Sequence, residues 1–231
     1  MSKISVLDID YEFGGMKDTI HPVILADNAE CVLVDCAYTG FLPQLEAAVT
    51  QAGYRCADIT KVVITHHDHD HMGCLGELKR KYPHIQIIAS EAEAPYISGQ
   101  MKSMRLKQAE ALQDSLPEDQ KEFGLKFCEI LRSVESVPAD IRVKDGDTFD
   151  WCGGCEIVAT PGHTPGHIAL YLKNENTIIT GDAAVPEDGS FAIANPQFTL
   201  DMQAAKHSLD KILSFPAETY ICFHGGVLKK R

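Results

Sequence analysis

Residues 61–73 read KVVITHHDHDHMG, and this stretch decides the fold that we expect. Its first five residues, KVVIT, are largely apolar and β-branched and predict a short buried strand. Four histidines and two aspartates follow at once, just before a helix predicted over 72–82. Imidazole and carboxylate are the ligands that borderline divalent metals prefer, and α/β sheets bind ligands at the ends of their strands. The stretch therefore predicts a metal site rather than a solvated surface run.

Three later strands are predicted to stop at the same kind of residues. Each is followed by His or Asp together with glycine: EIVAT-PGHTPGH (156–167), TIIT-GDA (177–183) and YICF-HGG (220–226). Glycine lets the backbone turn sharply and approach an ion closely. Four such strand ends in one chain predict a single site at one edge of a sheet.

The rest of the chain alternates between strand and helix patterns. Strands are expected at 4–9, 20–25, 31–35, 61–65, 85–89, 141–143, 148–151, 156–160, 168–172, 177–180 and 219–223, and helices at 41–52, 72–82 and 199–214. This order predicts an α/β fold with a partly parallel sheet covered by helices. No repeat or linker divides the chain, so we expect one domain.

Residues 99–137 interrupt the strands with two helical patterns. Met101 and Met104 share one predicted face, and Phe123, Phe127, Ile130 and Val134 share another. We therefore expect a helical hairpin inserted between strands. Its Met and Phe stripe is explained equally well by core packing and by contact with an apolar acyl group.

Composition excludes some classes of partner. Lys and Arg number 21 against 33 Asp and Glu, so the net charge of −12 disfavours nucleic acid. No apolar run reaches the roughly 18–20 residues of a membrane span. The first residues do not resemble a signal peptide, and most of the eight cysteines lie in apolar runs, so we expect a cytoplasmic protein with reduced thiols. Cys152-Gly-Gly-Cys155 is interpreted as a tight turn, with a redox disulfide as the alternative.

Together, the segments THHDHDHMG, TPGHTPGH, TGDA and HGG resemble the metallo-β-lactamase superfamily. The resemblance covers nearly the whole chain. It implies a four-layer αββα sandwich over residues 1–231, with the helical insertion at about 99–137 and a dinuclear metal site between two sheets. TPGHTPGH is more similar to glyoxalase II and the lactonases than to true β-lactamases, although the chain stops soon after His224, where glyoxalase II would continue.

The family's H-x-H-x-D-H pattern aligns with residues 66–71, where Asp68 replaces the second histidine. An alternative register uses His67, His69 and His71, but it loses the Asp-His pair. In the preferred register the resemblance implies a first metal on His66, Asp68 and His163, a second metal on Asp70, His71 and His224, and Asp182 as the bridge between them.

Two neighbouring residues receive other roles from the resemblance. His167 is expected to be a structural residue of its turn. Asp35 is expected either to orient the histidine loop or to be an ordinary turn residue.

The implied activity is hydrolysis of a small-molecule ester, thioester or lactone by a metal-bound hydroxide, with Asp70 as the catalytic residue that holds it and accepts its proton. Zinc is the expected metal. The Asp68 carboxylate shifts the preference toward iron or manganese, so Asp68→His should raise zinc affinity. The alternatives are a diiron redox protein resembling the flavodiiron oxygen and nitric oxide reductases, and a non-catalytic metal-binding module. The hairpin would serve either as a lid or as the contact of a homodimer.

Overall fold

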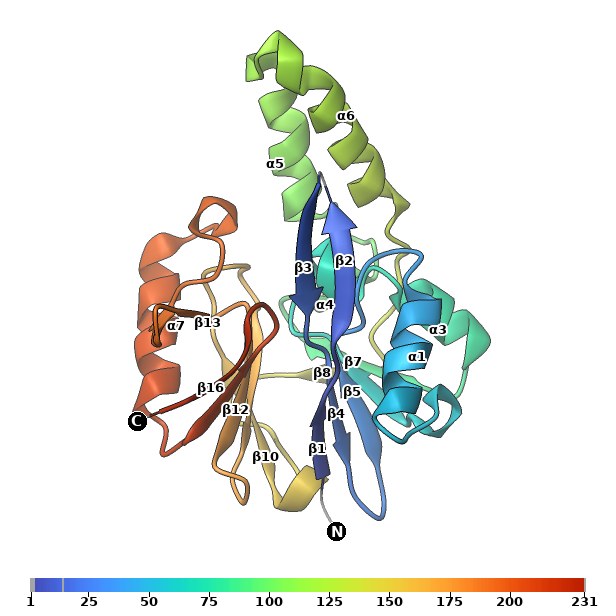
Figure 1. The fold of residues 1–231 in the computed structure, drawn as a ribbon, viewed down its shortest axis with the longest axis vertical. Helices are drawn as coiled ribbons and strands as arrows, with labels where there is room; N and C mark the ends of the chain where they lie inside the picture. The colour runs from blue at the N-terminus through green and yellow to red at the C-terminus, as the bar shows by residue number, and fades with distance from the viewer. Residues whose placement is uncertain (1–2, 14, 231) are drawn as a thin grey trace.

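The computed structural model describes residues 3–13 and 15–230, and two six-stranded sheets face each other at its centre (Figure 1). In spatial order, the first sheet contains β1 (Lys3–Val6), β4 (Val23–Ala26), β5 (Cys31–Val34), β6 (Lys61–Val63), β7 (Gln86–Ser90) and β8 (Ile141–Val143). The second contains β16 (Gly226–Lys229), β15 (Thr219–Cys222), β12 (Thr177–Gly181), β11 (Ile168–Leu172), β10 (Cys155–Ala159) and β9 (Thr148–Phe149). Strands β5 to β8 run parallel, as does the pair β12 and β15, which confirms the partly parallel sheet.

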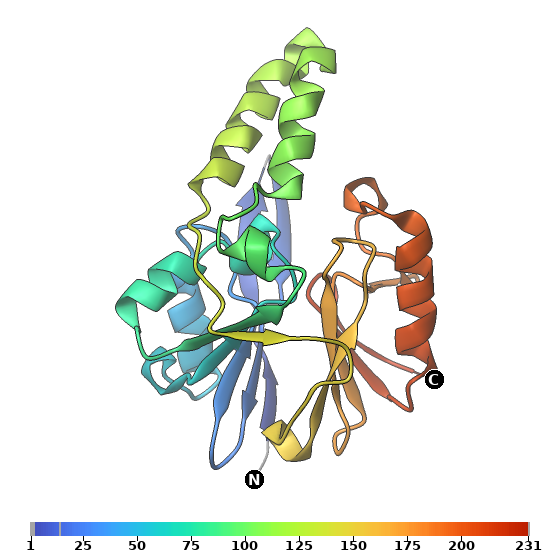
Figure 2. The ribbon, with the colours of Figure 1, turned by 180° about the vertical axis from the view of Figure 1, so that it is seen from behind.

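Each sheet buries both of its faces, which explains the nearly continuous apolar strands. In β11, Ile168 and Leu170 face the other sheet, whereas Ala169 and Tyr171 face the helix α7 (Met202–Ser214). The outer face of the first sheet is covered by α1 (Leu42–Gln51) and α3 (Leu75–Lys81). The result is the expected αββα sandwich, seen from behind in Figure 2.

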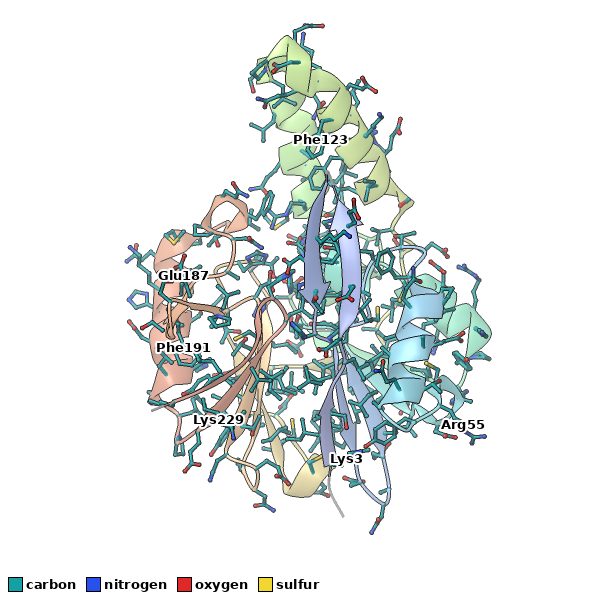
Figure 3. All side chains as sticks on the ribbon, viewed as in Figure 1. Lys3, Arg55, Phe123, Glu187, Phe191 and Lys229 are labelled. Atoms are coloured by element: carbon teal, nitrogen blue, oxygen red, sulfur yellow. The ribbon has the colours of Figure 1, made fainter. Side chains whose placement is uncertain are left out.

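The inserted hairpin leaves the sandwich between β7 and β8 and projects away from it (Figures 1 and 2). It consists of α5 (Met104–Leu112), the short turn η2 (Gln113–Ser115) and α6 (Glu118–Ser133). Phe127, Ile130 and Val134 of the predicted stripe are half-buried, whereas Phe123, labelled on the hairpin in Figure 3, is 54 % exposed and does not belong to it. The buried seam between the helices is formed by Leu106, Ala109, Cys128 and Leu131. Gly124 is also buried, against the side chains of Gln113 and Leu116 at the connecting turn, where a larger side chain would not fit.

Several shorter elements complete the fold. They are α2 (His69–Met72), α4 (Ala94–Ile97), η1 (Cys56–Asp58), η3 (Trp151–Gly153), η4 (Pro196–Phe198) and the ribbons β2 (Ile9–Phe13) with β3 (Met16–Ile20) and β13 (Val185–Glu187) with β14 (Ser190–Ala192). The single strand expected at 4–9 is therefore two strands, β1 and β2. Cys152 to Cys155 form the turn between β9 and β10, and all eight cysteines are buried free thiols. Within 3–13 and 15–230, no helix is both long and apolar enough to cross a bilayer.

Candidate metal centre

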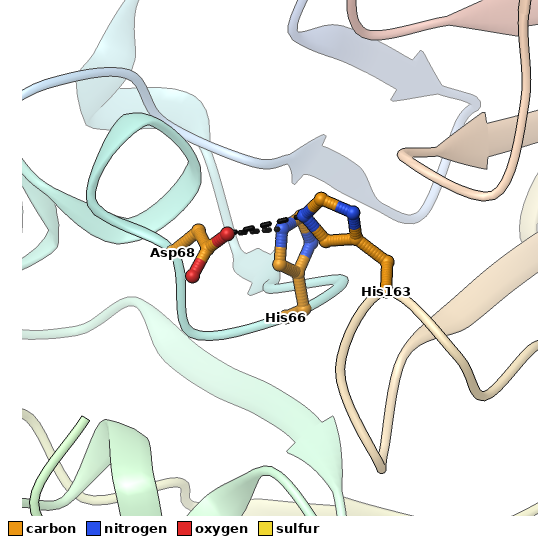
Figure 4. Close-up of side chains that lie close together, drawn as sticks. All are labelled: His66, Asp68 and His163. Atoms are coloured by element: carbon orange, nitrogen blue, oxygen red, sulfur yellow. Dashed lines mark hydrogen bonds and ion pairs between the residues drawn. The ribbon is translucent and has the colours of Figure 1, made fainter. Parts of the chain in front are cut away.

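The loops after β6, β10, β12 and β15 bring their polar residues together, as predicted. The expectation of one sheet edge was wrong, because β6 belongs to the first sheet and the other three strands to the second. His66, Asp68 and His163 form one cluster, which we call the first triad (Figure 4). Asp68 Oδ2 lies 3.1 Å from His163 Nε2 and 3.7 Å from His66 Nε2. All three side chains are buried.

A second triad lies beside the first and consists of Asp70, His71 and His224. Asp70 Oδ2 is 3.1 Å from His224 Nε2 and 3.7 Å from His71 Nε2. Asp70 and His71 belong to the one-turn helix α2, which begins directly after Asp68. The loop 66–71 therefore supplies residues to both triads.

Asp182 lies between the two triads at the end of β12. Its Oδ1 is 3.3 Å from His71 Nε2 and 3.7 Å from His224 Nε2, and its Oδ2 is 3.5 Å from His163 Nε2. One carboxylate therefore faces both clusters, one oxygen to each. The structure thus brings together all seven residues of the preferred register.

The donor atoms of this cluster fit divalent metal ions. Within the described part of the chain, five buried atoms of the cluster lack a hydrogen-bond partner: His66 Nε2, His71 Nε2, His163 Nδ1, Asp68 Oδ1 and Asp182 Oδ1. Buried polar atoms are normally satisfied, so an unpartnered group needs an explanation. Imidazole nitrogen and carboxylate oxygen are the common donors to zinc, and to iron or manganese in more oxygen-rich sites.

Burial and charge act in opposite directions on the titration of the cluster. Burial lowers the pKa of His71, but the surrounding carboxylates, led by Asp35, outweigh burial and raise this pKa well above its usual value. Burial raises the pKa of Asp182, but the imidazoles, led by His224, hold it well below its usual range. For His66, burial and the neighbouring imidazoles both lower the pKa. The carboxylates that favour a proton on His71 would also attract a metal cation, which competes with that proton for the imidazole.

Asp35 and Thr65 support His71 from behind. Asp35 Oδ2 is 2.8 Å from His71 Nδ1, and Asp35 Oδ1 accepts the Thr65 backbone N–H at 2.8 Å. Asp35 has a φ of 59°, a left-handed conformation that Asp and Asn tolerate better than most residues. The contact directs His71 Nε2 toward the centre, which agrees with the orienting alternative for Asp35.

The other histidines of the motif point away from the triads. His67 Nδ1 contacts the buried carboxylate of Glu93 at short range, and its ring stacks on Tyr96 at 4.4 Å. His69 packs edge-on against Tyr38 at 5.4 Å and Phe127 at 5.6 Å. The alternative register through these two histidines therefore finds no common cluster among the described residues.

His167 is held at both ring nitrogens. Its Nε2 accepts the Asp182 backbone N–H at 3.0 Å, and its Nδ1 is 2.8 Å from Thr160 Oγ1. Burial and the nearby imidazoles keep its pKa well below the usual value, so the ring is neutral. These contacts match the structural role expected for this residue.

Sequence reasoning missed two buried charged residues around the centre. Arg105, in α5, donates from Nη2 to Asp68 Oδ2 at 2.7 Å. Glu93 accepts the His67 backbone N–H at 3.0 Å with Oε2, and its Oε1 accepts a hydrogen bond from Thr164 Oγ1 at 2.7 Å. Neither carries a local signal, because each contact joins segments that lie far apart in the sequence.

The comparisons with known proteins agree with this geometry. The family model of the metallo-beta-lactamase superfamily matches residues 18–224. Among curated relatives, the probable metallo-hydrolase YflN of Bacillus subtilis (strain 168) is 25 % identical over 175 residues, covering 71 % of this chain and 63 % of YflN. A hydroxyacylglutathione hydrolase of Gloeobacter violaceus is 26 % identical over 186 residues, covering 79 % of this chain and 54 % of the relative. The chain thus spans less than two thirds of either relative.

Solved structures show the same fold. A metallo-beta-lactamase family protein from Thermus thermophilus superposes with a TM-score of 0.73 at 22 % identity, covering 98 % of this chain and 74 % of the other. A metallo-beta-lactamase from Pontibacter korlensis gives a TM-score of 0.71 at 15 % identity, covering 98 % and 89 %. With the family model matched over most of its length, this chain belongs to the metallo-β-lactamase superfamily.

Proposed function

We propose that this protein is a hydrolase that uses two divalent metal ions to cleave a small-molecule ester, thioester or lactone, with zinc as the expected metal. The observation that carries the proposal is the pair of triads joined by Asp182, with buried donor atoms that lack hydrogen-bond partners. Two ions held there would lower the pKa of a shared water and polarise the carbonyl oxygen of a substrate. Relatives named as metallo-hydrolases and hydroxyacylglutathione hydrolases support the reaction class.

The proposed ligand roles follow the two triads. His66, Asp68 and His163 hold the first ion, Asp70, His71 and His224 hold the second, and Asp182 bridges the two. The bridge is supported by the division of its contacts, because Asp182 Oδ1 faces the second triad and Oδ2 faces His163. The Asp68 carboxylate keeps iron or manganese as alternative ions.

Asp70 is the proposed catalytic residue. Burial raises its pKa, but the neighbouring imidazoles, led by His71, outweigh burial and keep the carboxyl ionised at neutral pH. Its Oδ2 contacts His224 at 3.1 Å, whereas Oδ1 is 3.6 Å from His69 Nδ1. An ionised carboxylate with one lightly engaged oxygen can hold the attacking water in line and accept its proton.

A cavity at the base of the hairpin is the proposed site for the acyl part of the substrate. Its volume is about 250 Å³, and apolar side chains such as Leu106, Leu131 and Met72 line it together with His69. Filling it with Leu131→Trp should raise KM for long-chain esters and leave KM for acetate esters unchanged. Equal effects on both substrates would contradict this assignment.

The proposed location is the cytoplasm, with a small molecule rather than nucleic acid as partner. Eight buried free thiols suit a reducing compartment, and the net charge of −12 disfavours polyanions.

Elemental analysis of protein purified without chelator or histidine tag tests the metal centre. We expect about two zinc ions per chain and hydrolysis of at least one member of a panel of esters, thioesters and lactones. Two irons with a redox-sensitive visible spectrum would instead support the diiron alternative. Protein that binds ions but hydrolyses nothing in the panel would support a binding module.

A further inference from the structure

The hairpin places a buried, positively charged side chain, that of Arg105, beside the first triad. The Arg105 side chain is 5 % exposed and donates from Nη2 to Asp68 Oδ2 at 2.7 Å. Its Nη1 donates to Gln108 Oε1 at 2.8 Å, and the guanidinium lies 4.7 Å from the centre of the Phe198 ring. A buried charge is costly unless it is paired, so these contacts fix the guanidinium against Asp68.

The charges of this pair cancel. In the motif that the chain resembles, the position of Asp68 holds a histidine, which is neutral as a ligand. Asp68 subtracts one charge there and Arg105 adds one, so the first triad together with Arg105 has the formal charge of three neutral imidazoles. Among the groups near Asp68, His163 and His66 contribute no charge when they bind a metal through Nε2.

We propose that Arg105 is a positioning residue that makes Asp68 act toward the first metal as a neutral ligand, an inference that rests on the two-metal centre proposed above. Arg105 donates to Oδ2 of the carboxylate, the oxygen that also faces the His163 and His66 nitrogens, so the guanidinium and an ion would share this oxygen. Oδ1 lacks a hydrogen-bond partner in the described chain. The guanidinium also cancels most of the extra negative charge that would shift the site toward iron or manganese.

The pairing changes the expectation for Asp68→His. An imidazole in this position would leave the Arg105 guanidinium buried without its carboxylate, next to the ion. The substitution should therefore lower zinc affinity, and affinity should return to the wild-type level only when Arg105 is neutralised in the same protein.

A double-mutant cycle tests this charge relation. Metal-free wild type, Arg105→Gln, Asp68→His and the double variant are titrated with Zn²⁺ against a chromophoric chelator, and with Co²⁺ followed by its visible spectrum. First-site affinity should follow the charge of the pair: Arg105→Gln binds tightest, wild type and the double variant are similar, and Asp68→His is weaker by roughly 10- to 100-fold. The cobalt spectrum reports the ligand set independently of any activity.

Arg132→Gln is the matched control, because Arg132 also lies on the hairpin but pairs with Glu110 at 2.7 Å on the surface. It should bind metal like the wild type. Thermal unfolding of each metal-free protein checks that it folds. If Asp68→His does not fold, Asp68→Asn takes its place, because both substitutions remove the same negative charge.

Two results would overturn the inference: weaker binding by Arg105→Gln, as a packing role predicts, or no recovery of affinity in the double variant. A wild-type protein that binds fewer than two ions would instead refute the proposed two-metal function, and the inference with it.

Discussion

The two triads are supported by opposite charges. In the second triad, the carboxylate of Asp35 holds the imidazole of His71 at 2.8 Å. In the first triad, the guanidinium of Arg105 holds the carboxylate of Asp68 at 2.7 Å. Asp35 follows a strand of the sandwich, whereas Arg105 comes from the inserted hairpin. The sandwich therefore completes one triad by itself, and the other depends on an insertion.

Removing the residue that the two triads share should have the largest effect. Asp182→Ala should abolish binding of two ions, because Asp182 faces His71, His224 and His163. We expect a loss of affinity beyond the roughly 100-fold that loss of an outer partner causes. Elemental analysis after dialysis measures it, with the exposed Asp210→Ala as control. Two tightly bound ions in Asp182→Ala would rule out the bridge.

Asp35→Asn tests whether the two triads have separate supporting residues. Asparagine tolerates the left-handed backbone at this position but removes the charge that orients His71. The second ion should bind roughly 10- to 100-fold more weakly, and the first should bind normally. Stepwise cobalt titration distinguishes the two. Equal weakening at both sites would show that the triads do not have separate supports.

His167 supports the centre without facing an ion, so its loss should affect stability rather than metal content. His167→Ala leaves the Asp182 backbone N–H without its acceptor, at a cost of about 2 kcal/mol in unfolding free energy. Elemental analysis should still find two ions, and urea unfolding should show the loss. A missing ion would make His167 a ligand.

Glu93 lies outside both triads and joins the loops that carry them, so Glu93→Gln should have the smallest effect. Burial raises the pKa of Glu93, but His67 outweighs it and holds the pKa below the usual 4.5. The ionised form therefore stabilises the fold above pH 4.5, and this contribution is lost as pH falls through the lowered pKa.

At pH 7 the variant should lose about 1.5 kcal/mol. The difference from wild type should shrink in urea unfolding as the pH falls below the usual 4.5. A difference independent of pH would mean that the charge of Glu93 contributes nothing.

Local patterns allowed an α/β fold and a metal site at the strand ends to be predicted, whereas the sandwich and the set of seven polar residues came from the resemblance to the family. Apolar strands followed by His or Asp with glycine indicate where the chain turns at the sheet edge. Arg105 could not be predicted, because its partner lies 37 positions earlier and only tertiary packing brings them together. For the same reason the buried face of α6 includes Gly124 rather than the larger Phe123.

Each triad draws residues from both sheets. Asp68 and His163 lie 95 positions apart, and Asp70 and His224 lie 154 positions apart. An ion in either triad is therefore a cross-link between the two halves of the chain, and it can form only after the halves have packed. Because such a ligand binds the folded chain alone, it adds to stability in proportion to the logarithm of its concentration. Removal of the ions by a chelator should then lower the free energy of unfolding, so that the fraction of folded protein depends on the concentration of free metal.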